Sequence, residues 1–314
     1  MRKHFIVVMD DIAAINPKKD SSFAMLLAAQ RRGYQTFYTN ETGLFLRGGE
    51  AGGHLQPITV RDQVSDWFEL GEPVSRPFGQ DDLIIMRADP PVDADYIHAT
   101  YLLDRAEAAG ALVINRPSSL REFNEKLATA RFPELIPDTL VSARHADLRA
   151  FVTAHGQAVL KPLDGMGGRG IFLARADDSN LNAMMEALTG GEQRQAMAQA
   201  FLPEIADGDK RVLLIQGQPV PYMLARVPGS EDFRGNLARG GRGEPRPITD
   251  VERHIAAVVG PTLVAHGIAF AGLDVIGDRL TEINHTSPTC IRELDAAFGL
   301  DIAMDLLTAV DPQL

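Results

Sequence analysis

The stretch Gly272-Leu-Asp-Val-Ile-Gly-Asp-Arg-Leu-Thr-Glu-Ile-Asn284 decides the fold of the second half of the chain. Residues 273–276 are mostly apolar and predict a short strand, Gly277-Asp278 predicts a tight turn, and residues 280–284 predict the returning strand. The segment therefore predicts a β-hairpin that carries acidic side chains among apolar ones.

The polar residues of this hairpin form a candidate metal site. Side chains two apart on a strand face the same way, so Glu282 and Asn284 project together, and Asp274 on the neighbouring strand lies within cross-strand reach. Two carboxylates and an amide oxygen make an all-oxygen site suited to Mg²⁺ that carries a polyphosphate. The alternative is a polar strand face exposed to water, and the hairpin alone does not decide between them.

A glycine-rich loop upstream provides a candidate phosphate site. The apolar strand 158–160 leads into Lys161 and then into 163–170, where four glycines occur within six residues, and the strand 171–173 follows. Glycines tolerate positive φ and let backbone N–H groups crowd an anion, and a lysine adds a point charge. The loop connects two strands, so it is neither a Walker A motif nor a dinucleotide fingerprint, both of which open a helix. A flexible hairpin turn is the alternative, but an ordinary hairpin needs one or two glycines.

Composition excludes several classes of protein. The chain has 314 residues, 45% of them hydrophobic and 23% charged, with a net charge of −11. This composition is ordinary for a globular protein long enough for two or three domains. It has no long Lys/Arg run, so we expect neither nucleic acid nor an anionic membrane as a partner. The lone Cys290 excludes an internal disulfide framework, and the first apolar run, 5–9, is too short for a signal-peptide core, so we expect a cytoplasmic protein.

The hydrophobic pattern changes along the chain. Residues 1–121 alternate short strands with helices, which predicts a parallel α/β layer, except that 44–80 is rich in Gly and Pro and predicts an excursion at the domain edge. Residues 122–200 and 201–314 predict two further units, the second mostly antiparallel. The expected strands are 5–9, 34–38, 83–86, 111–114, 139–141, 158–160, 171–173, 196–201, 210–215, 218–226, 270–276 and 280–284. The expected helices are 21–32, 94–109, 119–131, 146–155, 180–188 and 251–266.

The segment 228–243 alternates small residues with arginines. Such a segment buries little by itself, and we expect it to be mobile without ligand. As a lid it could bring Arg234 and Arg242 onto a bound anion. An ordinary solvent loop is the alternative, and the density of arginines beside glycines favours the lid.

Several strings together resemble the bacterial glutathione synthetase family of ATP-grasp carboxylate–amine ligases. They occur in order over nearly the whole chain, and their order is more specific than any one of them. They are Lys18-Lys-Asp-Ser-Ser-Phe-Ala-Met25, Met86-Arg-Ala-Asp-Pro-Pro91, Asn124-Glu-Lys126, Leu160-Lys-Pro-Leu-Asp-Gly-Met-Gly-Gly168, Asp207-Gly-Asp-Lys-Arg211, Arg234-Gly-Asn-Leu237, Gly240-Gly-Arg-Gly-Glu-Pro-Arg246 and the hairpin 272–284, with the resemblance ending near Arg292.

The resemblance implies a fold and a set of roles. The fold is an N-terminal parallel α/β (pre-ATP-grasp) domain, 1–121, followed by an ATP-grasp fold of two α+β subdomains, 122–200 and 201–314. The implied ATP-binding residues are Lys126, Lys161, Gly165, Gly167, Gly168, Gln199, Ala200, Phe201, Leu202 and Asp209. Asp274, Glu282 and Asn284 would hold two Mg²⁺, with Mn²⁺ as an alternative, against the ATP phosphates. Arg87 and Ser287 would bind the dipeptide, and Arg211, Arg226, Arg234 and Arg242 would gather the reacting carboxylate and γ-phosphate. Ala200-Phe201 departs from the more polar pair expected at the hinge.

The implied reaction joins γ-glutamylcysteine to glycine through an acyl phosphate and gives glutathione, ADP and phosphate, and the family implies a homotetramer. Two alternatives stay open: another ATP-grasp amino-acid ligase of the D-Ala–D-Ala or glutamate type, and a catalytically silent ATP-binding module. Structural roles are the simpler interpretation for three other residues. We expect Cys290 to be a buried thiol, Trp67 to be a core residue, and His285 to face away from the metal site because neighbours on a strand point oppositely.

Overall fold

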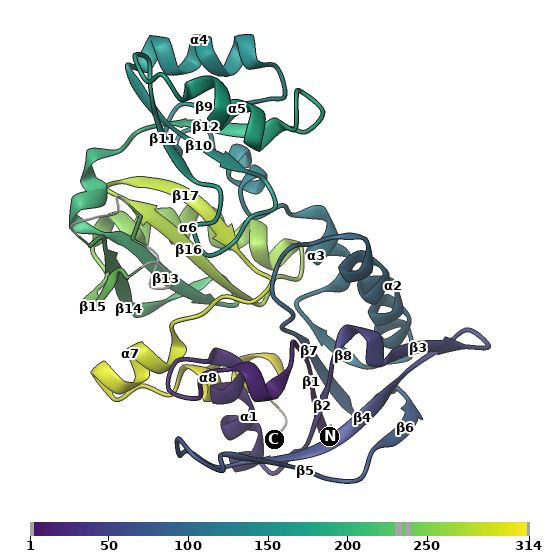
Figure 1. Ribbon diagram of the computed structural model, residues 1–314. Helices are drawn as coiled ribbons and strands as arrows, with labels where there is room; N and C mark the ends of the chain where they lie inside the picture. The colour runs from purple at the N-terminus through teal and green to yellow at the C-terminus, as the bar shows by residue number, and fades with distance from the viewer. Residues whose placement is uncertain (1–2, 230–233, 236–239, 313–314) are drawn as a thin grey trace.

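The computed structural model describes residues 3–229, 234–235 and 240–312. Figure 1 shows two parts, with the N-terminal layer at the bottom and two smaller sheets stacked above it. Within the described ranges, no helix is both long and apolar enough to cross a membrane.

The N-terminal layer is a sheet in the order β3-β4-β2-β1-β7-β8. The central strands β1 (His4–Val8), β2 (Gln35–Thr39), β7 (Asp82–Met86) and β8 (Leu112–Ile114) are parallel. Most residues of these strands are buried, and β1, β7 and β8 are largely apolar, because both faces of a parallel sheet are covered. The helices α1 (Ser21–Arg31) and α2 (Ala94–Ala108) pack on this sheet, and the Asp20 side chain caps α1 by accepting from Phe23 N at 2.7 Å.

The excursion predicted for 44–80 is an antiparallel extension of this sheet. It comprises β3 (Leu44–Arg47), β4 (Glu50–Val60), β5 (Phe68–Leu70) and β6 (Val74–Pro77), and β4 pairs with all three others. Gly52 explains part of the glycine content, because a Cβ there would lie 2.5 Å from both Arg76 O and the Phe45 ring. The glycines here permit close packing of strands rather than a loop.

The central sheet has the order β11-β10-β12-β9. It is built from β9 (Thr139–Ser142), β10 (Gln157–Pro162), β11 (Phe172–Arg175) and β12 (Ala196–Ala200), with α4 (His145–His155) and α5 (Leu181–Thr189) packed against it. The glycine loop connects β10 to β11, as the sequence predicted. Its phosphate-binding role stays a prediction at this stage.

The third sheet has the order β15-β14-β13-β16-β17 and is antiparallel. Its strands are β13 (Asp209–Ile215), β14 (Gln218–Val227), β15 (Arg242–Pro247), β16 (Phe270–Ile276) and β17 (Arg279–Asn284). Helix α6 (Asp250–Ala265) begins with a capping box between Thr249 and Glu252 and covers one face of the sheet with Ile255, Val259 and Leu263. Short 3₁₀ turns lie at Ile12–Ala14, Glu41–Gly43, Leu127–Arg131 and Pro203–Asp207.

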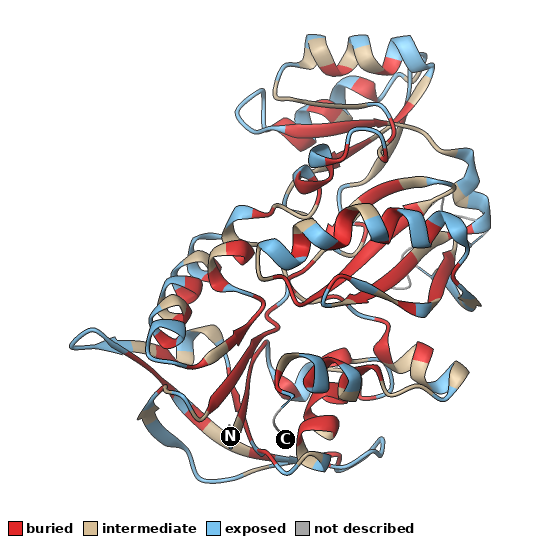
Figure 2. Cartoon of the chain, turned by 180° about the vertical axis from the view of Figure 1, so that it is seen from behind, coloured by how far each residue is buried: buried red, intermediate tan, exposed pale blue. Residues whose placement is uncertain are grey.

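Two C-terminal helices return to the N-terminal layer. The helices α7 (Ile291–Phe298) and α8 (Ile302–Val310) contact α1, and their apolar side chains share a core with those of β1 and α1. Figure 2 shows buried residues in both helices and in the strands of the sheets. These helices were not predicted from the sequence, and they connect the end of the chain to its beginning.

The single helix predicted for 119–131 is wrong. The structure has α3 (Pro117–Glu122) and then a 3₁₀ turn at Leu127–Arg131, separated by a short break. The side chain of Asn124 explains the break, because its Oδ1 accepts from Lys126 N at 3.1 Å and Leu127 N at 3.0 Å. Asn side chains compete with helical hydrogen bonds in this way. The break places Lys126 beside the glycine loop.

Burial raises the pKa of the Glu41 carboxyl to about 6, and the charges of Asp10, Asp93 and Asp95 add to the rise. A carboxyl whose pKa is raised in the folded state stabilises the fold when it is protonated. This stabilisation is complete below the ordinary pKa of 4.5 and is lost as the pH rises through 6. Glu41→Gln should therefore raise Tm, relative to the parent, by about 2 °C more at pH 7.5 than at pH 4.5.

Differential scanning calorimetry at both pH values measures this difference. The exposed Glu107→Gln on α2 is the control and should show no pH-dependent difference. An equal effect of Glu41→Gln at both pH values would contradict the assignment.

Candidate functional site

The acidic hairpin is formed by β16 and β17, and Asp274 pairs directly with Glu282. The Nδ2 of Asn284 donates to Asp274 Oδ2 at 3.1 Å, so all three polar side chains lie together. A register shift between Asp274 and Val275 interrupts the regular pairing beside these residues, as bulges often do near functional sites. The structure therefore places the three residues of the predicted metal site on one face.

Two arginines hold Asp274 from the neighbouring strands. Arg211 binds it in a bidentate fashion, with Nε 2.5 Å from Oδ1 and Nη2 3.0 Å from Oδ2, and Arg226 Nη2 lies 2.9 Å from Oδ2. Burial alone would raise the pKa of Asp274, but the charges of the two arginines outweigh it and hold that pKa below its usual range. Asp274 is thus ionised and fixed in position.

Arg226 also binds a second carboxylate. Its Nη2 lies 2.5 Å from Asp209 Oδ2, so one guanidinium bridges Asp209 and Asp274. Burial raises the pKa of Asp209 to about 6, because the attraction of Arg226 is smaller than the combined effects of desolvation and of the Asp274 charge. Among the described residues, Asp209 Oδ1 is buried and has no hydrogen-bond partner. A buried oxygen of this kind is a natural acceptor for a ligand hydroxyl.

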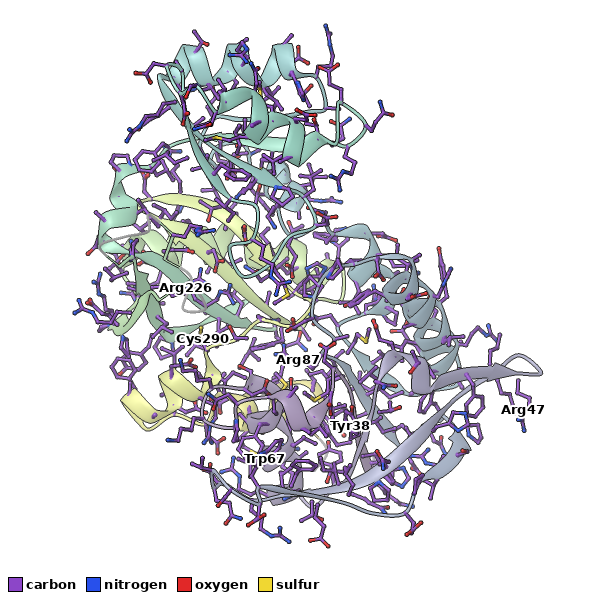
Figure 3. The ribbon with its side chains drawn as sticks, viewed as in Figure 1. Tyr38, Arg47, Trp67, Arg87, Arg226 and Cys290 are labelled. Carbon is purple, nitrogen blue, oxygen red and sulfur yellow. The ribbon has the colours of Figure 1, made fainter. Side chains whose placement is uncertain are left out.

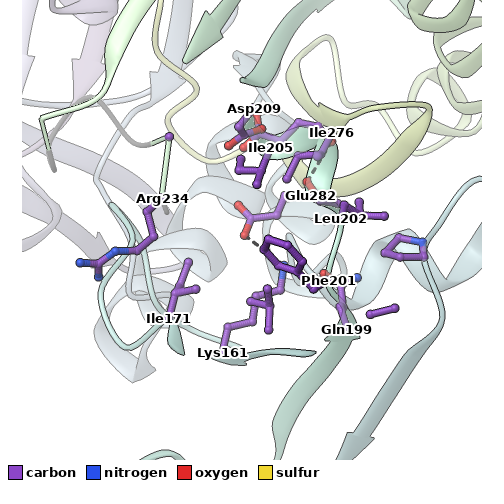
Figure 4. Close-up of a pocket in the computed structure, with 16 residues that line it drawn as sticks. Lys161, Ile171, Gln199, Phe201, Leu202, Ile205, Asp209, Arg234, Ile276 and Glu282 are labelled. Atoms are coloured by element: carbon purple, nitrogen blue, oxygen red, sulfur yellow. Dashed lines mark hydrogen bonds and ion pairs between the residues drawn. The ribbon is translucent and has the colours of Figure 1, made fainter. Parts of the chain in front are cut away.

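Two buried lysines converge on Glu282. Lys126 Nζ lies 3.8 Å and Lys161 Nζ 3.6 Å from Glu282 Oε1, and both lysines are almost fully buried. Burial lowers the pKa of Lys161, and the Glu282 carboxylate partly offsets this effect. Figure 4 shows Glu282 between Lys161 and Asp209. Lys126 Nζ also donates to Gly165 O at 2.6 Å, which ties the glycine loop to the same point.

A narrow apolar pocket of about 90 Å³ lies on one side of this charge cluster. The predicted hinge residues line it at the end of β12, namely Gln199, Ala200, Phe201 and Leu202. The other apolar lining residues are Pro137, Val159, Ile171, Ile205 and Ile276. A flat aromatic base is the kind of group that such a slot accommodates, with the charged residues at its inner end.

An open polar cleft of about 330 Å³ lies on the other side. Arg211, Arg226 and Asp274 line it together with the segment 286–290, so the cleft and the apolar pocket meet at Asp274 and Glu282. Figure 3 shows that Arg226, Cys290 and Arg87 lie one after another in space, from the third sheet toward the N-terminal layer. The cleft is therefore a candidate site for an acceptor close to a nucleotide phosphate.

Arg87 lies behind the wall of this cleft, at the end of β7. Its Nε donates to Ser22 Oγ and its Nη2 to Pro288 O, both at 3.0 Å. Its buried Nη1 has no hydrogen-bond partner among the described residues. Ser287, also predicted to bind substrate, lines the cleft and donates its Oγ to Asp89 Oδ1 at 2.6 Å.

The two predicted lid arginines are in different places. Arg234 lines the apolar pocket and donates from Nη1 to Gly168 O at 2.7 Å, and Gly235 passes so close to Arg226 that a Cβ would overlap the Arg226 carbonyl oxygen. Arg242 begins β15, where its side chain is exposed and pairs with Glu244, so the structure does not bring it to either pocket. Much of the predicted lid, 230–233 and 236–239, falls outside the described residues.

Nearly the whole chain matches two known family domains. Residues 4–121 match the family described as the prokaryotic glutathione synthetase N-terminal domain, and residues 125–299 match the prokaryotic glutathione synthetase ATP-grasp domain. The chain belongs to the prokaryotic glutathione synthetase family. The glutathione synthetase of Xanthomonas axonopodis pv. citri is 54% identical over 98% of this chain and 97% of that protein, and that of Escherichia coli K12 is 53% identical over 98% of each.

Solved structures show the same fold at low identity. The ATP-grasp ligase PsnB, solved with a minimal precursor, Mg and ADP, aligns with a TM-score of 0.60 and 18% identity over 99% of this chain and 97% of its own. The D-cycloserine synthetase DcsG aligns with a TM-score of 0.67 and 13% identity over 98% of each chain. The chain therefore has an N-terminal α/β domain followed by an ATP-grasp fold.

Some cleft residues of this glutathione synthetase family member were not predicted as site residues. Asn16, Asp20, Glu125, Thr286 and Glu293 line the cleft. Glu125 lies inside the Asn124-Glu-Lys126 string, so the signal was present but was assigned to the lysine alone. The predictions for three other residues are confirmed: Cys290 is a buried free thiol, Trp67 packs on Phe23, and His285 is buried against Ser119 O.

Proposed function

We propose that this chain ligates γ-L-glutamyl-L-cysteine to glycine with ATP, through an acyl phosphate, and releases glutathione, ADP and phosphate. The observation that carries the proposal is the junction at Asp274 and Glu282, where an apolar pocket and a polar cleft share one cluster of lysines, arginines and carboxylates. A phosphoryl transfer from a nucleotide in the pocket to a carboxylate in the cleft needs this arrangement, because reacting groups must be held in line and in contact.

ATP would occupy the pocket with its base against Ala200, Phe201 and Leu202 and its ribose near Asp209 Oδ1. Gln199 would lie at the base edge, and Lys126, Lys161, Gly165, Gly167 and Gly168 would surround the phosphates. Both lysines share Glu282 as their counter-ion, so a polyphosphate with a divalent cation would give each of them a further anionic partner. The family resemblance supports these assignments, and so does the lining of the pocket by Lys161, residues 199–202 and Asp209.

Divalent metal ions would be held by Asp274, Glu282 and Asn284. The donor set fits: Glu282 has a partly exposed carboxylate, and Asn284 donates through Nδ2, which leaves its Oδ1 as the atom for a cation. Both oxygens of Asp274 already contact Arg211 or Arg226, so Asp274 would bind a cation only through an oxygen that also contacts an arginine. We propose two Mg²⁺, with Mn²⁺ as a substitute, and the ions would supply charge neutralisation between the phosphates and the acceptor.

The protein residues would act mainly by positioning and electrostatics. The acceptor carboxylate would attack the γ-phosphorus, break its bond to the β,γ-bridging oxygen, and leave ADP. The amine of glycine would then attack the acyl carbon, lose a proton, and displace phosphate. Both steps build negative charge between anionic groups, which Arg211, Arg226 and Lys161 are placed to offset without a covalent nucleophile. Arg87 and Ser287 would orient the dipeptide.

The enzyme would work in the cytoplasm as a homotetramer; family resemblance supports both of these proposals. A D-Ala–D-Ala or glutamate ligase would share the pocket and the hairpin but would need a different cleft. A silent ATP-binding module would have no need for two buried lysines on one carboxylate together with an arginine pair on another.

ADP release by the purified protein with ATP and Mg²⁺, measured over a matrix of acceptors and amines, tests the proposal. Release that requires both γ-glutamylcysteine and glycine, with glutathione identified by mass, is the expected result. Release with another pair would overturn the substrate assignment and keep the ATP site. Tight ATP binding without release under any pair would favour the silent module.

Arg234 provides a prediction about shielding. Its contact with Gly168 O joins the lid segment to the glycine loop over the site where the acyl phosphate would form. Because Arg234 is one of many residues that line the apolar pocket, Arg234→Ala should weaken ATP binding only slightly. It should admit water to the acyl phosphate, so the ratio of ADP released to amide formed should rise from one to about two or more. Parallel coupled-enzyme and mass assays measure this ratio. A ratio that stays at one would contradict the shielding role, and the exposed Arg253→Ala is the control.

A further inference from the structure

Three consecutive residues after α3 contact two different parts of the site. Asn124 Nδ2 donates to Leu163 O at 2.9 Å, and Lys126 Nζ donates to Gly165 O at 2.6 Å, so both hold the glycine loop. Glu125, between them, contacts β17 instead of the glycine loop. Its backbone oxygen accepts from Ile283 N at 2.8 Å, on the strand that carries the candidate metal ligands. The segment 124–126 therefore joins the glycine loop to β17.

The side chain of Glu125 extends this connection past the end of β17. Its Oε1 accepts from His285 N at 3.0 Å, from Thr286 N at 3.2 Å and from Thr286 Oγ1 at 2.8 Å. Three donors on one carboxylate oxygen are charge-assisted, and such bonds are stronger than neutral ones. The side chain is only 15% exposed, so water competes weakly for these bonds. Glu125 thereby fixes the backbone immediately after Asn284.

The segment that Glu125 holds forms one wall of the polar cleft. Pro288 O accepts from Arg87 Nη2, and Ser287 Oγ donates to Asp89 Oδ1, so this wall also sets the position of the candidate substrate arginine. A shift at 285–286 would move Asn284 on one side and the partners of Arg87 on the other. One carboxylate is therefore linked both to the metal strand and to the acceptor wall.

We propose that Glu125 is a positioning residue that sets the acceptor wall 286–289 and Asn284 relative to the glycine loop, and so determines acceptor and metal affinity without touching the reacting atoms. This inference rests on the proposed ligation reaction. A purely structural carboxylate in the same place would affect unfolding alone, so the two roles differ in their kinetic consequences.

The experiment compares Glu125→Ala and Glu125→Gln with the parent enzyme. Glu125→Ala should raise the KM for γ-glutamylcysteine and the Mg²⁺ concentration for half-maximal rate by about 10- to 100-fold, the usual cost of losing a residue that orients a ligand. Binding of ATP itself, measured by calorimetry at saturating Mg²⁺, should change far less. Glu125→Gln keeps an acceptor oxygen for the same donors and should recover most of the lost affinity.

Glu252→Ala is the matched control. Glu252 is also a buried carboxylate with several donors, namely Thr249 N, Thr249 Oγ1 and Lys210 Nζ, but it caps α6 and lines neither pocket. It should lower Tm and leave both KM and the Mg²⁺ requirement unchanged. Glu125→Ala that behaves like Glu252→Ala, with lower Tm only, would overturn the proposal.

Two further readouts keep the test decisive. If Glu125→Ala does not fold, Thr286→Val removes one donor to the same oxygen and should raise acceptor KM in the same direction by a smaller factor, and an unchanged KM would overturn the proposal. If the parent protein makes no glutathione, the proposed function has failed. In that case the Mg²⁺ dependence of nucleotide binding by Glu125→Gln and Glu125→Ala still decides whether Glu125 positions the metal strand.

Discussion

Glu282→Gln should reduce kcat by about 100- to 1000-fold while leaving the fold intact. The substitution keeps the size of the side chain on β17 but removes the charge that faces both buried lysines. A neutral amide binds a divalent cation more weakly than a carboxylate does, so the Mg²⁺ concentration for half-maximal rate should rise. Steady-state rates over a Mg²⁺ series, with calorimetric Tm for the fold, measure both effects.

The same variant should also alter the pH profile. Burial already lowers the pKa of Lys161, and the Glu282 charge opposes that shift. Without this charge the lysine should lose its proton at a lower pH, so the alkaline limb of the kcat/KM(ATP) profile should move toward lower pH. Asp278→Asn, at the exposed tip of the same hairpin, is the control and should leave both rate and profile unchanged. Normal activity of Glu282→Gln at limiting Mg²⁺ would contradict the metal assignment.

The metal hairpin could be predicted from the sequence because it is local. Alternation places Glu282 and Asn284 on one face, and a two-residue turn brings Asp274 beside them. The glycine loop was predictable for the same reason. What the alternation does not contain is the pairing of Asp274 with Arg211 and Arg226, which depends on the order of β13, β14 and β16 in the sheet.

Long-range packing accounts for most of what the sequence did not predict. The strands between 44 and 80 have glycines where strands pack closely, as Gly52 does against Phe45, and this composition resembles a loop. The helices α7 and α8 each have an apolar face, and the partner that covers it, α1, lies far away in the sequence. The break at Asn124 was not predicted because the apolar periodicity continues through it. The helix ends there because the Asn124 side chain accepts hydrogen bonds from the backbone N–H groups of Lys126 and Leu127.

Arg226→Leu should cost both stability and activity, and its stability effect should be the largest of any single substitution proposed for this site. The guanidinium bridges Asp209 and Asp274, and all three groups are buried or nearly so. Removing it leaves Asp209 without its hydrogen-bonded cation and leaves Asp274 with Arg211 alone. Breaking a buried ion pair from one side typically costs about 3–5 kcal/mol because an uncompensated charge stays buried. Chemical denaturation with a linear extrapolation measures this loss.

The matched control is Arg246→Leu, since Arg246 also contacts two carboxylates, Glu244 and Asp207, but does so at the surface. It should cost less than about 1 kcal/mol. Adding Asp209→Asn to Arg226→Leu removes the uncompensated charge and should restore much of the stability. It should not restore turnover, because the cation that faces the reacting carboxylate is still missing and an apolar side chain cannot offset the charge of the transition state. Recovery of both stability and turnover in the double variant would show that Arg226 serves only to neutralise the charge of Asp209. Arg226 would then have no direct role in catalysis.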